Sequence, residues 1–152
     1  MNDQQLIYEA WIAYGSMGLG LLMILVIYIY NYMFIKNNSK ELSERIYGIE
    51  EYIDHVGVNL EMVLQLNFIF SFMWFSYFIT YKRYRKMAYF AKRGEESPSL
   101  YPNLYQDNVI YLCEKFKKHI IINEMLSLVI ILLAIPFFLS KHIAKFIVYL
   151  GF

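Results

Sequence analysis

Three long apolar runs constrain this chain more than any other feature of its sequence. The first, residues 11–35, contains no charged residue in 25 positions. About 20 apolar residues in a helix cross the hydrocarbon core of a bilayer, so this run is long enough to span one. The segment before it is acidic rather than basic, and the apolar run is long. Both features argue against a cleaved signal peptide.

The second and third apolar runs cover residues 62–81 and 120–140. The second is uncharged and is followed at once by a basic segment, 82–86. An abrupt change from apolar and aromatic residues to basic ones is typical of the point where a helix leaves the membrane. The third run is broken only by Asn123 and Glu124 near its start. The sequence therefore predicts three transmembrane helices, over 11–35, 62–81 and 120–140.

The charges of the two loops predict the orientation. The loop 36–61 holds three basic and six acidic residues, whereas the loop 82–118 holds nine basic and four acidic ones. Short loops rich in Lys and Arg stay in the cytoplasm. We therefore expect a bacterial inner-membrane protein with a cytoplasmic N-terminus and an outside C-terminus. The frequent use of Ile, Tyr, Asn and Lys is typical of an AT-rich genome. It therefore also fits a mitochondrially encoded protein, and we keep the mitochondrial inner membrane as the alternative location.

The acidic loop carries an apolar stripe with alternating spacings of four and three residues, which is typical of one face of a helix. We expect an amphipathic helix over 40–56 that lies in the membrane interface. This apolar stripe has two interpretations. It packs against neighbouring helices of the same chain as a structural connection, or it forms an interface with a second copy or a partner. Its members are Leu42, Ile46, Ile49, Ile53 and Val56.

The basic loop predicts a cytoplasmic helical hairpin over 82–118. Nothing before Gly94 interrupts a helix that continues from the second run. A loop with Pro98 and Pro102 follows, and a new helix starting near Asp107 runs without a breaker into the third run. The two legs of the hairpin are then extensions of the second and third transmembrane helices.

The composition supports a membrane protein of one domain, 1–152. Hydrophobic residues make up 59% of the chain and charged residues 18%, whereas soluble domains average about 45–50% and about 25%. A net charge of +1 in so apolar a chain excludes disorder, and the single cysteine excludes a disulfide scaffold. We expect an all-α integral membrane protein with three transmembrane helices, an interfacial amphipathic helix and a cytoplasmic helical hairpin.

Polar residues within the apolar runs are the first candidate site. Several are four residues apart and so share a helix face. Such a face can join helices through hydrogen bonds or line a path for ions or protons. Glu124 lies near one edge of its run, which disfavours a proton-carrying role. The residues of this intramembrane polar face are Gln65, Asn67, Ser71, His119, Asn123, Glu124 and Ser127.

Small residues in the first run are a second, weaker signal. Ser16 and Gly20 form a small-xxx-small pair, which lets helix backbones approach closely. We expect them to pack against another helix, within one copy or between two.

A basic cluster after the second run is the strongest charge feature. It fixes topology, and it also suits anionic lipid headgroups or a protein partner. Aromatic residues among the charges are compatible with nucleic acid, but they suit an interfacial helix better, so nucleic-acid binding is disfavoured. The cluster consists of Lys82, Arg83, Arg85, Lys86, Lys92 and Arg93.

Enzymatic motifs are missing from the sequence. It holds no phosphate-binding glycine loop, no H-E-x-x-H and no G-x-S-x-G. Its three histidines are far apart, without the spacing of a metal site. Cys113 has lysines nearby but lies on the apolar face of its expected helix, which favours a buried, inert thiol. We expect no catalytic residues, no metal and no cofactor.

One part of the chain resembles a known family. The stretches are RYRKMAYFAKRG, residues 83–94, and YLCEKFKKHIIINEMLSLVIILLAIPFF, residues 111–138. They are similar to the C-terminal half of universal stress protein B-type small bacterial membrane proteins, in which an Arg-rich exit precedes a basic amphipathic helix and a last span. The resemblance implies a bacterial inner membrane and brings no catalytic residues.

Three functional hypotheses follow. The first is a non-enzymatic membrane subunit, adaptor or sensor that acts on a membrane-protein partner through helix packing and the basic hairpin. The second is a homo-oligomeric pore or membrane-perturbing effector of the holin, toxin or phage-defence type. The third is a mitochondrially encoded subunit of a respiratory complex.

Overall fold

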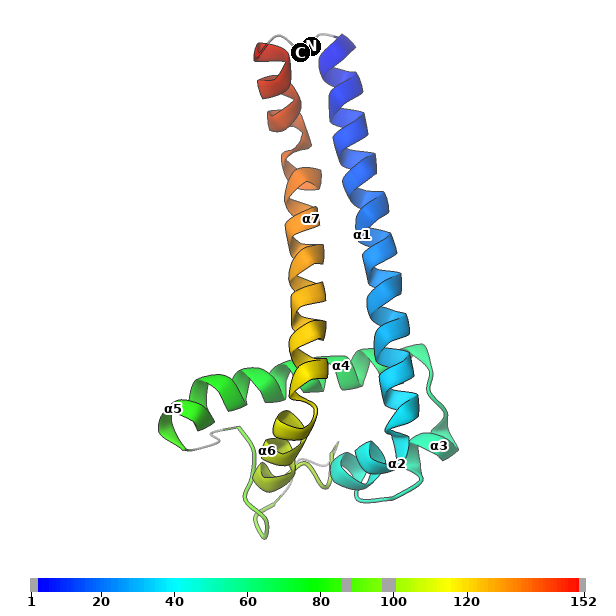
Figure 1. The fold of residues 1–152 in the computed structure, drawn as a ribbon, viewed down its shortest axis with the longest axis vertical. Coiled ribbons are helices and arrows are strands. Elements are labelled where there is room, and N and C mark those ends of the chain that lie inside the picture. The colour runs from blue at the N-terminus through cyan, green and yellow to red at the C-terminus, as the bar shows by residue number, and fades with distance from the viewer. Residues whose placement is uncertain (1–2, 86–88, 97–100, 151–152) are drawn as a thin grey trace. The chain divides into compact units, whose positions relative to one another are not determined.

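The computed structural model describes residues 3–85, 89–96 and 101–150, and these residues fold into helices joined by short turns and loops (Figure 1). They form two compact units. The helical pair comprises residues 3–28 and 124–150, and the central unit comprises residues 29–123. The elements are α1 (Asp3–Asn37), α2 (Ser39–Leu42), the π-helix η1 (Ser43–Tyr47), α3 (Tyr52–Val56), α4 (Leu60–Ser76), the π-helix η2 (Tyr77–Tyr81), α5 (Lys82–Tyr84), α6 (Gln106–Lys115) and α7 (Lys117–Tyr149).

Three helices are long and apolar enough to cross a membrane, which confirms the expected helical, membrane-compatible architecture at this level. They are Asp3–Asn37, Leu60–Tyr84 and Lys117–Tyr149. The second differs from the others in its surroundings. In its most apolar window 44% of the residues are buried within the protein, against 6% and 11% in the first and third.

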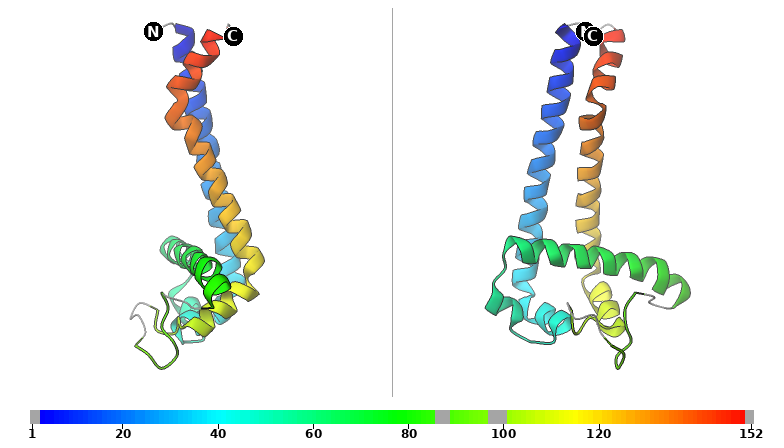
Figure 2. Two further views of the ribbon diagram at one scale, coloured as in Figure 1. Left: turned by 90° about the vertical axis from the view of Figure 1, so that its left-hand side faces the viewer. Right: turned by 180° about the vertical axis from the view of Figure 1, so that it is seen from behind.

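In the helical pair, the N-terminal part of α1 and the C-terminal part of α7 run side by side, and their described ends lie together (Figures 1 and 2). Ser16 is buried, and its hydroxyl donates to the carbonyl oxygen of Ile12 at 2.7 Å. Ser16 and Gly20 line a shallow groove of about 330 Å³ with Leu133 and Ala134 of α7. A Cβ added at Gly20 meets no atom within 4 Å. The helices are therefore not closely packed at Gly20.

In the central unit, α4 lies across the last residues of α1 and the first residues of α7 (Figure 2). One face of α4 is buried, with Leu66 and Met73 fully enclosed. The opposite face is exposed although it is equally apolar. We call it the aromatic face, and it consists of Leu64, Phe68, Phe72 and Phe75 of α4 together with Ile79 of η2.

The single helix expected over 40–56 is wrong. The helical turns α2 and η1 end at Tyr47, Gly48 adopts a left-handed conformation with φ of 76°, and α3 starts only at Tyr52. Gly48 allows this reversal because it lacks a Cβ.

The break divides the apolar stripe of the acidic loop. Leu42, Ile46 and Ile53 are fully buried in the central unit, whereas Ile49 and Val56 are 59% and 50% exposed. The backbone N–H of Ile53 donates to the Ser43 hydroxyl at 2.9 Å, which holds α3 against η1. Most of the stripe is therefore used within one copy.

The long hairpin expected over 82–118 also differs from the structure. Instead of continuing to Gly94, the helix ends at Tyr84, where Arg85 takes a left-handed conformation with φ of 54°. The C-terminal leg is also broken: α6 ends at Lys115, and Phe116 leaves the helical conformation before α7 begins. Phe116 is buried and packs edge-on against Phe34 at 5.0 Å between ring centroids, so tertiary packing places this break.

Asn108 joins the acidic and basic loops in the core of the central unit. It is 1% exposed. Its side-chain oxygen accepts from Arg45 Nη1 at 3.0 Å, and its Nδ2 donates to the carbonyl oxygen of Asn103 at 2.7 Å. The backbone N–H of Asn103 donates in turn to the carbonyl oxygen of Ile46 at 3.1 Å. The two loops therefore form one folded module rather than separate extensions.

We predict that Gly48→Ala destabilises the protein by about 1–2 kcal/mol, because a left-handed residue with a Cβ is strained by that amount. Thermal unfolding in detergent, followed by circular dichroism, measures the change. Gly15→Ala is the matched control, since it lies within α1 and a Cβ there meets nothing within 4 Å. Equal melting temperatures for the two variants would contradict the strain at Gly48.

Candidate functional site

Four polar side chains from three helices form a hydrogen-bonded chain inside the central unit. His119 Nε2 lies 3.1 Å from Asn31 Oδ1. Asn31 Nδ2 donates to Asn123 Oδ1 at 2.7 Å, and Asn123 Nδ2 donates to Asn67 Oδ1 at 2.6 Å. Asn31 and Asn123 are 2% and 1% exposed. Each amide in this chain thus donates to the next, from α1 to α7 to α4. When the imidazole proton is on Nε2, His119 is the first donor of the chain.

Aromatic rings enclose the imidazole of His119. It stacks on Phe34 with ring centroids 3.5 Å apart and on Tyr30 at 4.6 Å. Phe70 meets it edge-on at 6.3 Å and also meets Phe34 edge-on at 5.7 Å. The polar chain is therefore closed at its histidine end by a layer of aromatic side chains from α1 and α4.

Of the expected intramembrane polar face, Asn67, His119 and Asn123 come together. Gln65 is exposed and donates to Glu61 Oε1 at 3.0 Å instead. Ser71 is half-buried, and Glu124 and Ser127 belong to the helical pair. Asn31 completes the cluster and was missed, although an asparagine within an uncharged apolar run is itself a signal of polar packing.

The chemistry of this cluster favours helix packing. Amide side chains do not titrate near neutral pH, and they exchange no proton with a neighbouring imidazole. The hydrogen bonds named above pair the amides with one another, and Asn31 and Asn123 are almost fully buried. Within the described central unit they hold α4 across α1 and α7.

The basic cluster remains largely exposed. Lys82, Arg83 and Arg85 lie over aromatic rings near them in the chain, at 5.4–5.6 Å from the ring centroids. Lys92 is exposed, and Arg93 pairs with Asp107 at 2.7 Å. Lys86 lies outside the described residues. The exposed charges follow the aromatic face of α4 directly.

Two carboxylates of the central unit are held in their charged form. Burial works to raise the pKa of Glu41, but hydrogen bonds from Lys115 Nζ at 2.5 Å and from the Tyr111 hydroxyl at 2.6 Å outweigh it, and the pKa is lowered. Burial also works to raise the pKa of Asp107, but the hydrogen bonds and the charge of Arg93 outweigh it, and the pKa is lowered. Both pairs join parts of the chain that are distant in sequence.

The described residues contain no group of three or more His, Cys, Asp or Glu side chains placed to hold a metal ion. Cys113 is fully buried in α6, and burial, with the charge of Glu114, raises the pKa of its thiol to about 12. The thiol therefore stays protonated at neutral pH, which suits a packing role.

Comparison of the chain with known protein families, with curated proteins and with solved structures gives no match. The resemblance to universal stress protein B-type proteins therefore stays a prediction.

We predict that Asn67→Leu and Asn123→Leu each lower the free energy of unfolding by about 0.5–2 kcal/mol, the range found for hydrogen bonds between membrane helices. The double variant should cost clearly less than the sum, because both changes remove the same Asn123–Asn67 bond. Unfolding of all four proteins in detergent measures the coupling. Additive losses would contradict a shared hydrogen bond.

We also predict that Glu41→Gln lowers the melting temperature at pH 7 but not in acid. Because the pKa of Glu41 is lowered by folding, its charged form stabilises the native state above its unfolded pKa of about 4.3. This stabilisation is lost as the pH falls through the lower native value. Melting curves between pH 7 and pH 3 should converge, whereas Glu44→Gln, an exposed acid nearby, should show no such pattern.

Proposed function

We propose that the chain is a non-enzymatic membrane adaptor, in which two helices anchor a folded module at the cytoplasmic surface of a bacterial inner membrane. The observation that carries the proposal is the position of α4. In the central unit it crosses α1 and α7 rather than running alongside them, and it keeps an exposed aromatic face (Figure 2). A helix in this position suits the membrane surface better than a third crossing.

The surface of α4 supports this placement. Its exposed Phe68 and Phe75 suit the boundary between acyl chains and headgroups. Lys82, Arg83 and Arg85 follow and suit the anionic headgroups beside it. Within the described chain only Phe72 of this face is covered, by Tyr89 and Phe90, and the rest of the face needs either lipid or a partner protein to cover it.

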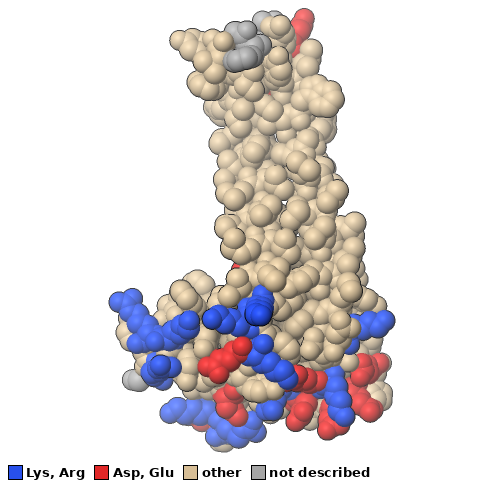
Figure 3. All heavy atoms as spheres, viewed as in Figure 1, with Lys and Arg blue, Asp and Glu red and all other residues tan. Residues whose placement is uncertain are grey.

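The charge distribution supports a cytoplasmic central unit. Of the 14 Lys and Arg residues, all except Lys141 and Lys145 lie between residues 36 and 118, and residues 1–35 contain none. On the face shown in Figure 3, charged side chains gather over the central unit, and the helical pair is almost free of them. Basic residues are retained in the cytoplasm.

In this proposed arrangement we expect the start of α1 and the end of α7 on the outside. It differs from the opposite-sided termini expected from three crossings, and the adjacent ends of α1 and α7 in the helical pair support it. The reason for the difference is α4, which the sequence alone presents as a third crossing.

Single cysteines test the topology. In a Cys113→Ala background, Gln4→Cys and Lys145→Cys should both react with a membrane-impermeant maleimide added to intact spheroplasts. Lys40→Cys should react only after the membrane is permeabilised. Labelling of positions 4 and 145 from opposite sides would restore the three-crossing arrangement and contradict the surface position of α4.

Native mass spectrometry of protein extracted gently from its own membrane tests the adaptor function. We expect a defined complex with another membrane protein, and we expect Arg83→Glu with Arg85→Glu to release that partner while Lys141→Glu does not. The alternative is a homo-oligomeric pore. A complex of identical chains that conducts ions in planar bilayers, with conductance abolished by Asn67→Leu, would replace the adaptor by the pore.

A further inference from the structure

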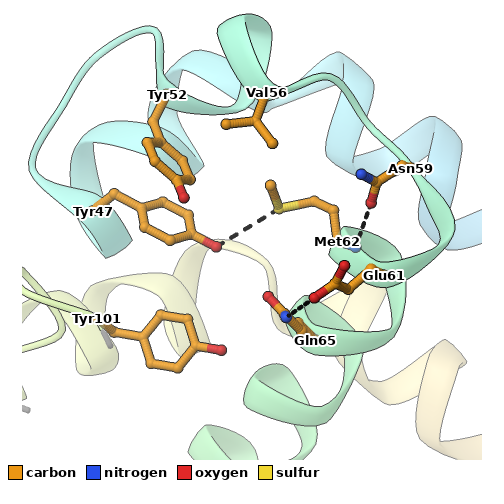
Figure 4. Close-up of a pocket in the computed structure, with 8 residues that line it drawn as sticks. All are labelled: Tyr47, Tyr52, Val56, Asn59, Glu61, Met62, Gln65 and Tyr101. Atoms are coloured by element: carbon orange, nitrogen blue, oxygen red, sulfur yellow. Dashed lines mark hydrogen bonds between the residues drawn. The ribbon is translucent and has the colours of Figure 1, made fainter. Parts of the chain in front are cut away.

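A pocket of about 250 Å³ lies in the central unit (Figure 4). It is formed where η1, α3, the start of α4 and the loop before α6 meet. Three tyrosines, one carboxylate and two amides contribute polar groups, and two apolar side chains complete the wall. The lining residues are Tyr47, Tyr52, Val56, Asn59, Glu61, Met62, Gln65 and Tyr101.

The tyrosine wall is held in place by its own packing. Tyr47 is 8% exposed and stacks on Tyr52 with ring centroids 4.1 Å apart, and Tyr101 lies 5.9 Å from it. The Tyr47 hydroxyl donates to Met62 Sδ at 3.6 Å. Because Tyr47 and Tyr52 stack on each other, part of their ring area faces a neighbouring ring, while their hydroxyl edges face the pocket (Figure 4).

The opposite wall is formed by the first turns of α4. Asn59 caps this helix, accepting from the Met62 N–H at 2.8 Å, and so fixes the direction of the turn that carries Glu61 and Gln65. Gln65 Nε2 donates to Glu61 Oε1. This bond orients both side chains beside the tyrosine hydroxyls (Figure 4). Carboxylate, amide and phenol oxygens therefore converge on one small volume.

The charge around the pocket is negative. The segment 36–61 holds six acidic and three basic residues. Of the acids close to the pocket in sequence, Glu51 and Asp54 are exposed, and Lys40 is paired with Glu50 at 3.3 Å. Among the described residues, no Lys or Arg lines the pocket. The field at this site favours a cation.

We propose that the pocket binds the primary ammonium group of a small amine. A primary ammonium carries three N–H donors, which match the converging oxygens, and the Glu61 carboxylate supplies the opposite charge. A quaternary ammonium needs open ring faces instead, and stacking covers part of these. Two sources carry this group: the headgroup of phosphatidylethanolamine, favoured by the exposed Leu60 and Leu64, which precede the lining residues Glu61 and Gln65 in the sequence, and a soluble alkylamine. The site is independent of the proposed adaptor function.

Native mass spectrometry of the intact detergent-solubilised protein tests the site. Phosphatidylethanolamine, phosphatidylcholine of the same acyl chains, and ethylammonium chloride are each titrated. We expect phosphatidylethanolamine to be retained more strongly than phosphatidylcholine. If ethylammonium displaces it at comparable concentrations, the source is a soluble amine, and if it does not, the source is the lipid. Equal retention of the two lipids together with no binding of ethylammonium overturns the proposal.

Variants connect binding to the pocket. Glu61→Gln keeps the size of the side chain and removes its charge, and it should weaken binding about tenfold or more, as expected for a charge-assisted hydrogen bond. Asp54→Asn makes the same charge change on an exposed residue outside the lining and should leave binding within about twofold, because exposed charges act weakly through solvent. Tyr101→Phe should weaken binding less than Glu61→Gln. Equal effects of Glu61→Gln and Asp54→Asn overturn the site.

Discussion

The hydrogen-bonded chain from His119 through Asn31 and Asn123 to Asn67 is the constraint on which the central unit depends. An amide in an apolar interior is costly unless it is paired. Asn67 reaches Asn123 only if α4 crosses the start of α7 at that point. The position of α4, and with it the course of the loops on either side, therefore follows from satisfying three amides in one place.

This position leaves α4 apolar on both faces. Its inner face closes the core around Leu66 and Met73. Its outer, aromatic face is covered only at Phe72, which packs on Tyr89 and Phe90, and is otherwise exposed. A water-soluble protein rarely exposes such a face. The basic residues that follow α4 and the acidic segment that precedes it give its two ends opposite surroundings. One end suits anionic headgroups and the other suits cations.

The apolar runs and their helices could be predicted from sequence because length and hydropathy decide them without tertiary contacts. The breaks could not. Gly48 lies within a regular apolar stripe, and the regular spacing of that stripe predicts one continuous helix despite the glycine. In the structure the chain reverses at Gly48, and both Ile46 and Ile53 are buried in the same core. Phe116 carries no local breaker signal, yet α6 ends there, where its buried ring packs against Phe34. Such breaks depend on contacts between residues far apart in the chain.

Helix geometry alone could have shown that two of the expected site residues do not share a helix face. Gln65 and Asn67 were expected on one intramembrane polar face. They are two positions apart in the sequence, however, and such residues are about 200° apart around an α-helix. They must therefore point in nearly opposite directions. The structure uses both directions: Asn67 turns into the amide chain, and Gln65 turns with Glu61 toward the tyrosines. One helix thus separates the polar groups that hold the fold together from those that remain available to a ligand.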